Sequence, residues 1–434
     1  MMFAALFKAA LLALPTLAFT YPPPGPCHGN CTGHVHDPKV IRRDDGLYVR
    51  LTTNGRINIA TAPAIEGPWT YQCPMLPDCS IIQLKGRCDL WAPDVIKTDG
   101  EYYAFYSVSE IGSRNSDIGV ASSPNMECGT WTDHGAIGIP TGSWNRIDPN
   151  FYQTSSGESG YMVWGSFWTD IWQTRMSNPP IKVLEPVTTI HLQQNTTKRP
   201  QNRPIGPCEG GYQFRWVVDG TAYHYLFFSS GACCNKPPNL LPAGEEYKVM
   251  VCRSSKPTGP FTDKAGRNCA TETGGTIVLE SHDDVFAPGG QGVMVDQDKR
   301  SVIMYYHYIN KSLGYDYDQF QFGWNKLDFR SGWPVAVSFG EQDEPDVVEE
   351  PDTTTREKTL SLQSGTENTQ SAASSFDSPG VAPSSVSFDT TSPATSFEAA
   401  SATVSTSTTS SSASSDMTTS SSISGAHRRF SFRF

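Results

Sequence analysis

The chain of 434 residues carries 33 Lys and Arg against 44 Asp and Glu, a net charge of −11. This excess of acid argues against nucleic acid as a partner, because binding to phosphates requires a basic surface. All 10 Trp, 17 Tyr and 11 Cys lie before residue 340. The composition therefore predicts one aromatic-rich body over residues 21–340 and a separate acidic tail over residues 341–434.

Residues 1–20 are typical of a secretory signal peptide. Lys8 precedes an apolar stretch from Ala9 to Ala18, with small residues near the expected cleavage point. The stretch is too short to span a bilayer, and Pro15 interrupts it. We therefore expect a secreted protein without a membrane segment. In such a protein the Asn-X-Ser/Thr sequons are glycan acceptors, and they lie at Asn30, Asn195 and Asn310.

A sequence unit recurs five times over the body with a period of about 55–60 residues. Each copy starts with a polar residue beside Pro or Gly, continues with an apolar run and a turn, and then has an aromatic β-rich segment. The copies begin at His36, Ala92, Ile147, Cys208 and Pro288. Third strands are expected at 58–61, 118–122, 171–176, 248–253 and 323–328. This repeat predicts an all-β, five-bladed β-propeller, with an irregular β-sandwich as the alternative.

The segment 353–424 contains 38 Ser or Thr among its 72 residues. Such a sequence buries too little apolar surface to offset the entropy of ordering. We expect a disordered, O-glycosylated stalk, or alternatively a plain linker.

Secretion implies that most of the cysteines form disulfides, and an odd number leaves at least one thiol over. Cys27 and Cys31 are close enough in sequence to pair, and Cys252 and Cys269 flank a loop. The adjacent pair at 233–234 either forms a strained ring or bonds elsewhere.

The first strand of each blade is expected to lie beside the central axis. This placement brings Asp37, Asp94, Asp148 and Glu209 to one cavity. Carboxyls that share a cavity repel each other, so their pKa values separate, and a glycosidase requires such a pair. The alternative is that each Asp-Pro or Pro-Asp pair only shapes a turn.

Aromatic residues near these acids favour a sugar substrate. Sugars present apolar faces to aromatic rings, and the candidates are Trp91, Trp144, Phe167 and Trp168. The alternative is that these rings form core between blades. Of the four, Trp91 and Trp168 are favoured for substrate binding.

Several segments that carry these residues resemble glycoside hydrolase family 43, and within it the secreted fungal endo-1,5-α-L-arabinanases. They occur in family order between about residues 27 and 337. The matching segments are Val35-His36-Asp37-Pro38, Asp89-Leu90-Trp91-Ala92-Pro93-Asp94-Val95, Ile147-Asp148-Pro149-Asn150, Gly165-Ser166-Phe167-Trp168, Glu209-Gly210-Gly211-Tyr212, Ser230-Gly231-Ala232-Cys233-Cys234 and Phe322-Gly323-Trp324-Asn325.

The resemblance implies a five-bladed propeller and an inverting mechanism. Asp37 matches the general base, Glu209 the general acid, and Asp148 the residue that orients Glu209 and tunes its pKa. Inversion implies a gap of about 6.5–9.5 Å between the first two carboxyls. The expected substrate contacts are Trp91, Asp94, Trp144, Asn145, Ser166, Phe167 and Trp168.

The chain also departs from the family pattern. Many arabinanases carry Pro-Gly-His in the fifth blade, with the His beside a central metal ion. Gly290 stands at that position here, which puts a metal held by His in doubt, and no cofactor is expected to be required. Five cysteines look additional to the pattern, and one of them, Cys208, directly precedes Glu209. The others are Cys73, Cys79, Cys88 and Cys128.

The sequence thus predicts a monomeric endo-arabinanase acting on arabinan, the side chain of pectin, without nucleic acid or membrane partners. Two alternatives remain. One is an exo-acting α-L-arabinofuranosidase or β-xylosidase of the same family. The other is a propeller that binds carbohydrate without cleaving it.

Overall fold

The computed structural model describes residues 21–29, 33–155, 158–197, 207–233 and 235–338. The predicted signal peptide and the predicted tail lie outside these residues, as does the sequon at Asn30. Within the described part of the chain, no helix has the length and apolar character needed to cross a bilayer.

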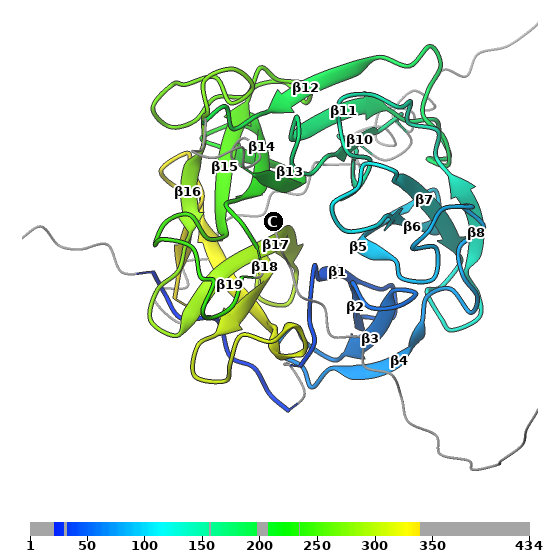
Figure 1. The fold of residues 1–434 in the computed structure, drawn as a ribbon, viewed down its shortest axis with the longest axis horizontal. Helices are drawn as coiled ribbons and strands as arrows, with labels where there is room; N and C mark the ends of the chain where they lie inside the picture. The colour runs from blue at the N-terminus through cyan, green and yellow to red at the C-terminus, as the bar shows by residue number, and fades with distance from the viewer. Residues whose placement is uncertain (1–20, 30–32, 156–157, 198–206, 234, 339–434) are drawn as a thin grey trace, which may run out of the picture. The chain divides into compact units, whose positions relative to one another are not determined.

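Five antiparallel sheets of four strands each lie around a common centre (Figure 1). Blade 1 contains β1 (Lys39–Arg42), β2 (Tyr48–Thr52), β3 (Asn58–Ala62) and β4 (Thr70–Pro74). Blade 2 contains β5 (Trp91–Thr98), β6 (Glu101–Val108), β7 (Asp117–Ser123) and β8 (Thr132–Ala136). Blade 3 contains β9 (Asn150–Tyr152), β10 (Tyr161–Trp164), β11 (Ile171–Arg175) and β12 (Thr189–Gln193).

Blade 4 contains β13 (Cys208–Val218), β14 (Thr221–Ser230), β15 (Lys248–Ser254) and β16 (Thr276–Leu279). Blade 5 contains β17 (Val285–Asp296), β18 (Ser301–Asn310), β19 (Gln321–Asp328) and β20 (Val335–Val337), with the short 3₁₀ helix η1 (Tyr317–Gln319) before β19. In every blade the strands pair in chain order. The predicted five-bladed propeller is confirmed, and each expected third strand is the third strand of its blade.

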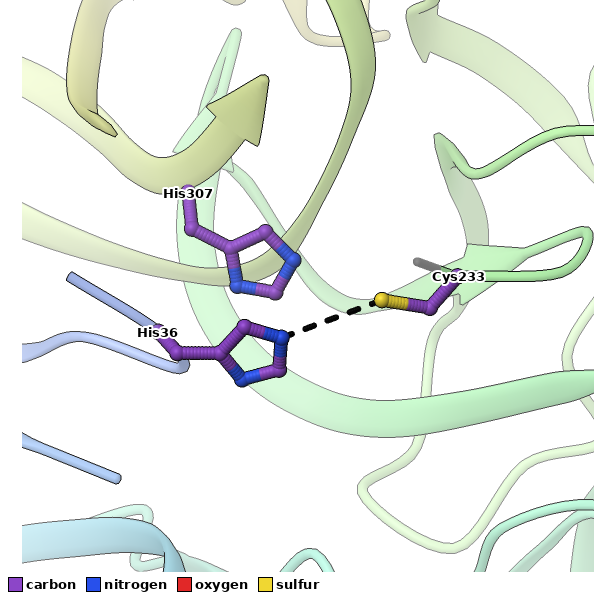
Figure 2. A group of neighbouring side chains, drawn as sticks. All are labelled: His36, Cys233 and His307. Carbon is purple, nitrogen blue, oxygen red and sulfur yellow. Dashed lines mark hydrogen bonds between the residues drawn. The ribbon is translucent and has the colours of Figure 1, made fainter. Parts of the chain in front are cut away.

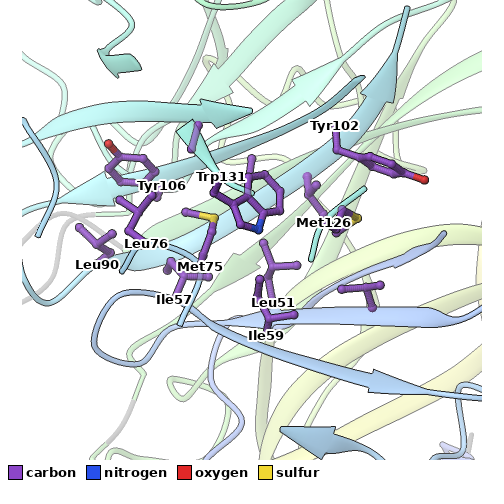
Figure 3. Close-up of a cluster of buried hydrophobic side chains, with 14 of the residues drawn as sticks. Leu51, Ile57, Ile59, Met75, Leu76, Leu90, Tyr102, Tyr106, Met126 and Trp131 are labelled. Carbon is purple, nitrogen blue, oxygen red and sulfur yellow. The ribbon is translucent and has the colours of Figure 1, made fainter. Parts of the chain in front are cut away.

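The hydrophobic core lies between neighbouring blades. The cluster between blades 1 and 2 combines Leu51 and Ile59 with Tyr102, Met126 and Trp131, all nearly inaccessible to solvent (Figure 3). Alternate side chains of a strand point to opposite faces, so each blade contributes one face to each of its two neighbours. The aromatic content of the repeats supplies the bulk that fills these wedges.

Blade 5 closes the ring onto blade 1 by side-chain packing. One buried cluster joins Val40 and Tyr48 of blade 1 to Ile303, Tyr305 and Trp324 of blade 5. In the described residues no strand is shared between blades 1 and 5, so this packing acts together with polar contacts such as the ion pairs Arg42–Asp298 and Lys299–Glu66.

An N-terminal strap, residues 21–29, adds hydrogen bonds across the same seam. The Gly25 N–H donates to the Trp324 carbonyl over 2.7 Å. The Trp324 indole donates to the Pro26 carbonyl over 3.0 Å, and the Asn325 amide donates to the Pro23 carbonyl over 2.8 Å. The start of the body is therefore tied to its last blade.

Three disulfides are described in full. Cys73–Cys128 links blade 1 to blade 2, Cys79–Cys88 closes a short loop between these blades, and Cys252–Cys269 confirms a predicted pair. Cys27 and Cys233 are also disulfide-bonded, whereas Cys31 and Cys234 lie outside the described residues. Cys208 is the one free thiol in the described segments, and it is buried. Four of the five additional cysteines thus pair with one another.

Candidate active site

Two of the predicted acids occupy strained backbone positions directly before a proline. Asp37 has φ 44° and Asp148 has φ 57°, and each precedes the first strand of its blade. Left-handed backbone costs a residue other than Gly about 1–3 kcal/mol, and residues held in it cluster at functional sites as well as in turns. Asp tolerates this conformation better than most residues.

Asp37 is surrounded by groups that stabilise its ionised form. Its Oδ2 accepts a hydrogen bond from the Thr53 hydroxyl over 2.8 Å and lies 2.9 Å from His36 Nδ1. Its backbone N–H donates to His307 Nδ1 over 3.0 Å. Burial acts to raise the pKa of Asp37, but His36, His307 and Thr53 together hold it well below its usual range. Asp37 is therefore a carboxylate, the form that a general base requires.

Glu209, the second residue of β13, has a raised pKa, in contrast to Asp37. The Ser166 hydroxyl donates to its Oε2 over 2.5 Å, and the Tyr247 hydroxyl donates to its Oε1. Burial raises the pKa of Glu209, the two hydroxyls lower it, and the charge of Asp37 raises it again. The net shift is upward, which favours a protonated carboxyl that can act as an acid.

Asp148 lies beside both of these groups. Its Oδ2 accepts a hydrogen bond from the Gly210 N–H over 3.1 Å, and its own N–H donates to the Ser107 hydroxyl. Burial, together with the charges of Glu209 and Asp37, raises the pKa of Asp148 well above its ordinary value. The structure therefore brings three of the four predicted acids together.

Asp94 does not join them. Its carboxylate is 2% exposed, pairs with Lys39 of β1 over 2.5 Å, and accepts from the Phe151 N–H of β9 over 2.7 Å. The prediction that four acids share one cavity is therefore wrong for Asp94. The left-handed residue before the blade 2 proline is Ala92, with φ 42°, so Ala92 occupies the place of Asp37. Asp94 lies two residues further along β5 and joins three blades.

The segment 166–168 lies next to Glu209. Ser166 contacts Glu209 directly, and the Phe167 N–H donates to the Cys208 carbonyl over 3.0 Å. Trp168 is 39% exposed, and the Arg114 guanidinium lies 5.9 Å from the centre of its ring. An exposed indole in the segment that contacts Glu209 is suited to packing against a sugar.

The remaining predicted contacts lie deeper in the fold. Trp144 is half-buried and packs against Trp164 and Trp172, with ring centroids 6.1 and 4.9 Å away, so it adds to the core, and its contact with the substrate stays a prediction. Asn145 is 3% exposed and accepts from the Ser116 hydroxyl over 2.6 Å. Trp91 is half-buried at the start of β5.

The model of glycosyl hydrolases family 43 matches residues 31–334, which include all three acids. The chain belongs to this family, and it is a glycosidase. It is 48% identical over 326 residues to a probable arabinan endo-1,5-alpha-L-arabinosidase A of Emericella nidulans, covering 74% of this chain and 95% of that one. It is 46% identical over 339 residues to arabinan endo-1,5-alpha-L-arabinosidase A of Aspergillus aculeatus, covering 77% and 100%.

The solved structures that resemble this chain include arabinanases as well. An endo-arabinanase of this family from Bacillus licheniformis superposes with a TM-score of 0.57 at 26% identity, covering 72% of this chain and 99% of that one. An exo-1,5-alpha-L-arabinanase from a bovine ruminal metagenomic library gives 0.60 at 25% identity, covering 71% and 99%. The resemblance inferred from the sequence motifs is confirmed at the level of the family.

Among the residues of this family 43 site that the sequence did not predict are Tyr247 and His307. Both lie outside the recurring acid motifs. The available signal was the glycine pair before Gln291, because glycine often marks a close approach of other groups. A Cβ on Gly289 would lie 2.1 Å from the Tyr247 ring, and one on Gly290 would lie 2.6 Å from His307 Nδ1.

The side chains of His36, Cys233 and His307 form a cluster whose donor atoms lie within 4.8 Å of one another (Figure 2). Two observations argue against a metal-ligand set. The Cys233 sulfur is in a disulfide and is not a thiolate. His307 Nδ1 accepts from the Asp37 N–H, so the proton of the neutral ring is on Nε2, and that nitrogen has no lone pair to offer an ion. His36 Nε2 is then the one donor left in the cluster, which is too little to hold an ion. The cluster therefore does not fit a metal, and hydrolysis by this family requires no cofactor.

Proposed function

We propose that this glycosidase cleaves internal α-1,5-linkages of arabinan with inversion of configuration. Asp37 is the general base, Glu209 the general acid, and Asp148 the residue that orients Glu209 and tunes its pKa. The observation that carries the proposal is the opposite shift of two neighbouring carboxyls, with the pKa of Asp37 lowered and that of Glu209 raised. Environments that separate two pKa values in this way assign the base and the acid.

The reaction follows from these two protonation states. Asp37 takes a proton from a water molecule as the water oxygen attacks the anomeric carbon. Glu209 gives its proton to the departing glycosidic oxygen, so that the leaving chain departs as an alcohol. Inversion requires about 6.5–9.5 Å between the two carboxyls, so that the water fits between Asp37 and the sugar.

Two observations support arabinan as the substrate. The Emericella nidulans and Aspergillus aculeatus relatives, at 48% and 46% identity, are named as a probable arabinan endo-1,5-alpha-L-arabinosidase A and an arabinan endo-1,5-alpha-L-arabinosidase A. The matches cover nearly their whole length. Trp168 also offers an exposed ring two residues after Ser166, which contacts Glu209.

The test is incubation with linear, debranched arabinan and analysis of the products. We expect short oligosaccharides early in the reaction, released as the inverted anomer in proton NMR. Asp37→Asn and Glu209→Gln should each lower kcat by about 10²–10⁴-fold, the usual contribution of general acid–base catalysis. Asp219→Asn is a matched control, because Asp219 has φ 48° and is exposed in the turn between β13 and β14.

Each other outcome identifies a different function. Release of monomers alone would select an exo-acting member of the family, and cleavage of aryl xylosides but not arabinan would select a β-xylosidase. Binding of arabinan without turnover would select a carbohydrate-binding propeller. Unchanged rates in Asp37→Asn or Glu209→Gln would refute the assigned roles.

The proposal includes secretion. Three disulfides in the described body are typical of an oxidising compartment, which agrees with the signal-like residues 1–20. We expect mature protein in the culture medium, with an N-terminus near Tyr21 by sequencing. Protein that stays inside the cell with residues 1–20 still attached would contradict this part of the proposal.

A further inference from the structure

We infer that Tyr247 and Ser166 are positioning residues for the catalytic acid, whose hydroxyls fix both oxygens of Glu209 and stabilise the carboxylate left when its proton has gone. The inference rests on the proposed role of Glu209. It also changes the expected role of Ser166, from contact with the substrate to contact with the acid.

The geometry places one hydroxyl on each carboxyl oxygen. Tyr247 donates to Oε1 and Ser166 donates to Oε2. A carboxylate accepts both of these hydrogen bonds, whereas a protonated carboxyl must use one oxygen as a donor. The pair therefore complements the ionised Glu209 that forms as the proton leaves. Interactions that are stronger in the transition state than in the ground state are those that raise kcat.

Tyr247 directly precedes β15, and its side chain is tightly packed. The residue is 4% exposed, and its ring lies nearly parallel to that of His307, with centroids 6.0 Å apart and 8° between the planes. His307 in turn accepts from the Asp37 N–H. Gly289 leaves the space that the Tyr247 ring fills. The acid and the base are therefore connected through two packed rings.

Ser166 is fixed by backbone pairing with the acid itself. Ser166 and Glu209 form an isolated antiparallel bridge, and Ser166 is 3% exposed. A buried hydroxyl this close to Glu209 has few other orientations. Little conformational entropy is therefore lost when it donates to the Glu209 carboxylate that forms as the proton leaves.

The direction of the pH effect follows from the groups around Glu209. Hydrogen bonds donated to a carboxylate favour its charged form, so the loss of either hydroxyl raises the pKa of Glu209. The kcat/KM profile falls on its basic side as the general acid loses its proton, so this basic limb should move to higher pH. The other titratable groups that act on or adjoin Glu209 are Asp37, Asp148, Asp170, His36 and Cys208, and they are unchanged in the variants.

The experiment measures kcat and KM on linear arabinan against pH for Tyr247→Phe and Ser166→Ala. We expect kcat to fall roughly 10–100-fold and the basic limb to move up by about one pH unit, as for a lost hydrogen bond to a charged group. Tyr225→Phe is the matched control, because its buried hydroxyl donates to the Gly332 carbonyl, away from the acids. Its basic limb should stay in place.

Other results would overturn the inference. A basic limb that stays in place or moves to lower pH in both variants contradicts it. A higher KM with unchanged kcat in Ser166→Ala would return Ser166 to substrate binding. Should Tyr247→Phe fail to fold, Ser166→Ala still decides the matter. Full activity in Glu209→Gln would instead refute the proposed function. An inactive Glu209→Gln, together with unshifted basic limbs in Tyr247→Phe and Ser166→Ala, would refute the inference alone.

Discussion

Asp148 illustrates how single residues of the site give up stability for reactivity. It is buried beside Glu209 and Asp37, and its backbone is in the left-handed region. The raised pKa means that the folded protein retains a proton that the unfolded chain releases. Stability therefore falls as pH rises from about 4 through the raised folded pKa.

Asp148→Asn should remove this loss of stability. Asn tolerates left-handed backbone and keeps an oxygen that can accept from the Gly210 N–H. We expect the decrease in Tm between pH 4 and pH 7 to be smaller than in the wild type, although activity falls. Calorimetry at several pH values measures this, with Asp219→Asn as a control. An unchanged decrease would mean that Asp148 does not carry the extra proton.

The acids were predictable from sequence because the repeat places Asp37, Asp148 and Glu209 near the starts of first strands. Asp94 was misplaced because an Ala-Pro-Asp sequence can be aligned with Asp-Pro in two registers, and only the backbone shows that Ala92 is the equivalent residue. The glycine pair before Gln291 indicates a close approach but not that Tyr247 makes it, since the Tyr247 hydroxyl reaches Glu209 only through packing against residues far away in sequence.

At the scale of elements, the strands were predictable because β-rich runs alternate with Asp-Gly turns at a regular period. The role of Trp144 was not predictable, because core packing and sugar binding require the same kind of residue. Trp144 contacts Trp164 and Trp172 but remains half-buried, so these contacts show packing against the core and leave the binding of sugar as a prediction.

The disulfide Cys73–Cys128 should contribute strongly to stability because it joins two blades across a sequence separation of 55 residues. The loop-entropy relation gives roughly 4 kcal/mol for this crosslink and roughly 2.6 kcal/mol for Cys79–Cys88, whose separation is 9 residues. We expect the double Ser variant of the first pair to lose more free energy of unfolding in urea than that of the second. The reverse order would show that local packing outweighs the entropy of the unfolded chain.

At the scale of the whole propeller, the N-terminal strap holds blade 5 against blade 1. Trp324 and Asn325 lie in one of the family 43 segments, and the structure gives them a role at this seam. The sequence did not reveal the strap, because a Pro-rich segment carries no periodic pattern that would indicate its partner.

Gly25→Ala should weaken the seam. A Cβ at this position would lie 2.4 Å from the Trp324 ring, so either the strap or the ring must move. Overpacking of this kind costs about 1–3 kcal/mol, and we expect a lower Tm with little change in KM. Pro26→Ala serves as the control, since it keeps the carbonyl that accepts from Trp324. Equal Tm values for the two variants would mean that the seam does not depend on the strap.

The strap also determines when the protein can finish folding during its synthesis. Its hydrogen bonds to Trp324 and Asn325 join positions 298 and 302 residues apart. The first part of the body to leave the ribosome must therefore wait for the last blade to emerge. Contacts between such distant positions form slowly, and open intermediates expose apolar surface. Until blade 5 is made, the face of blade 1 that packs against it stays uncovered, so this interval is the one in which aggregation is most favoured.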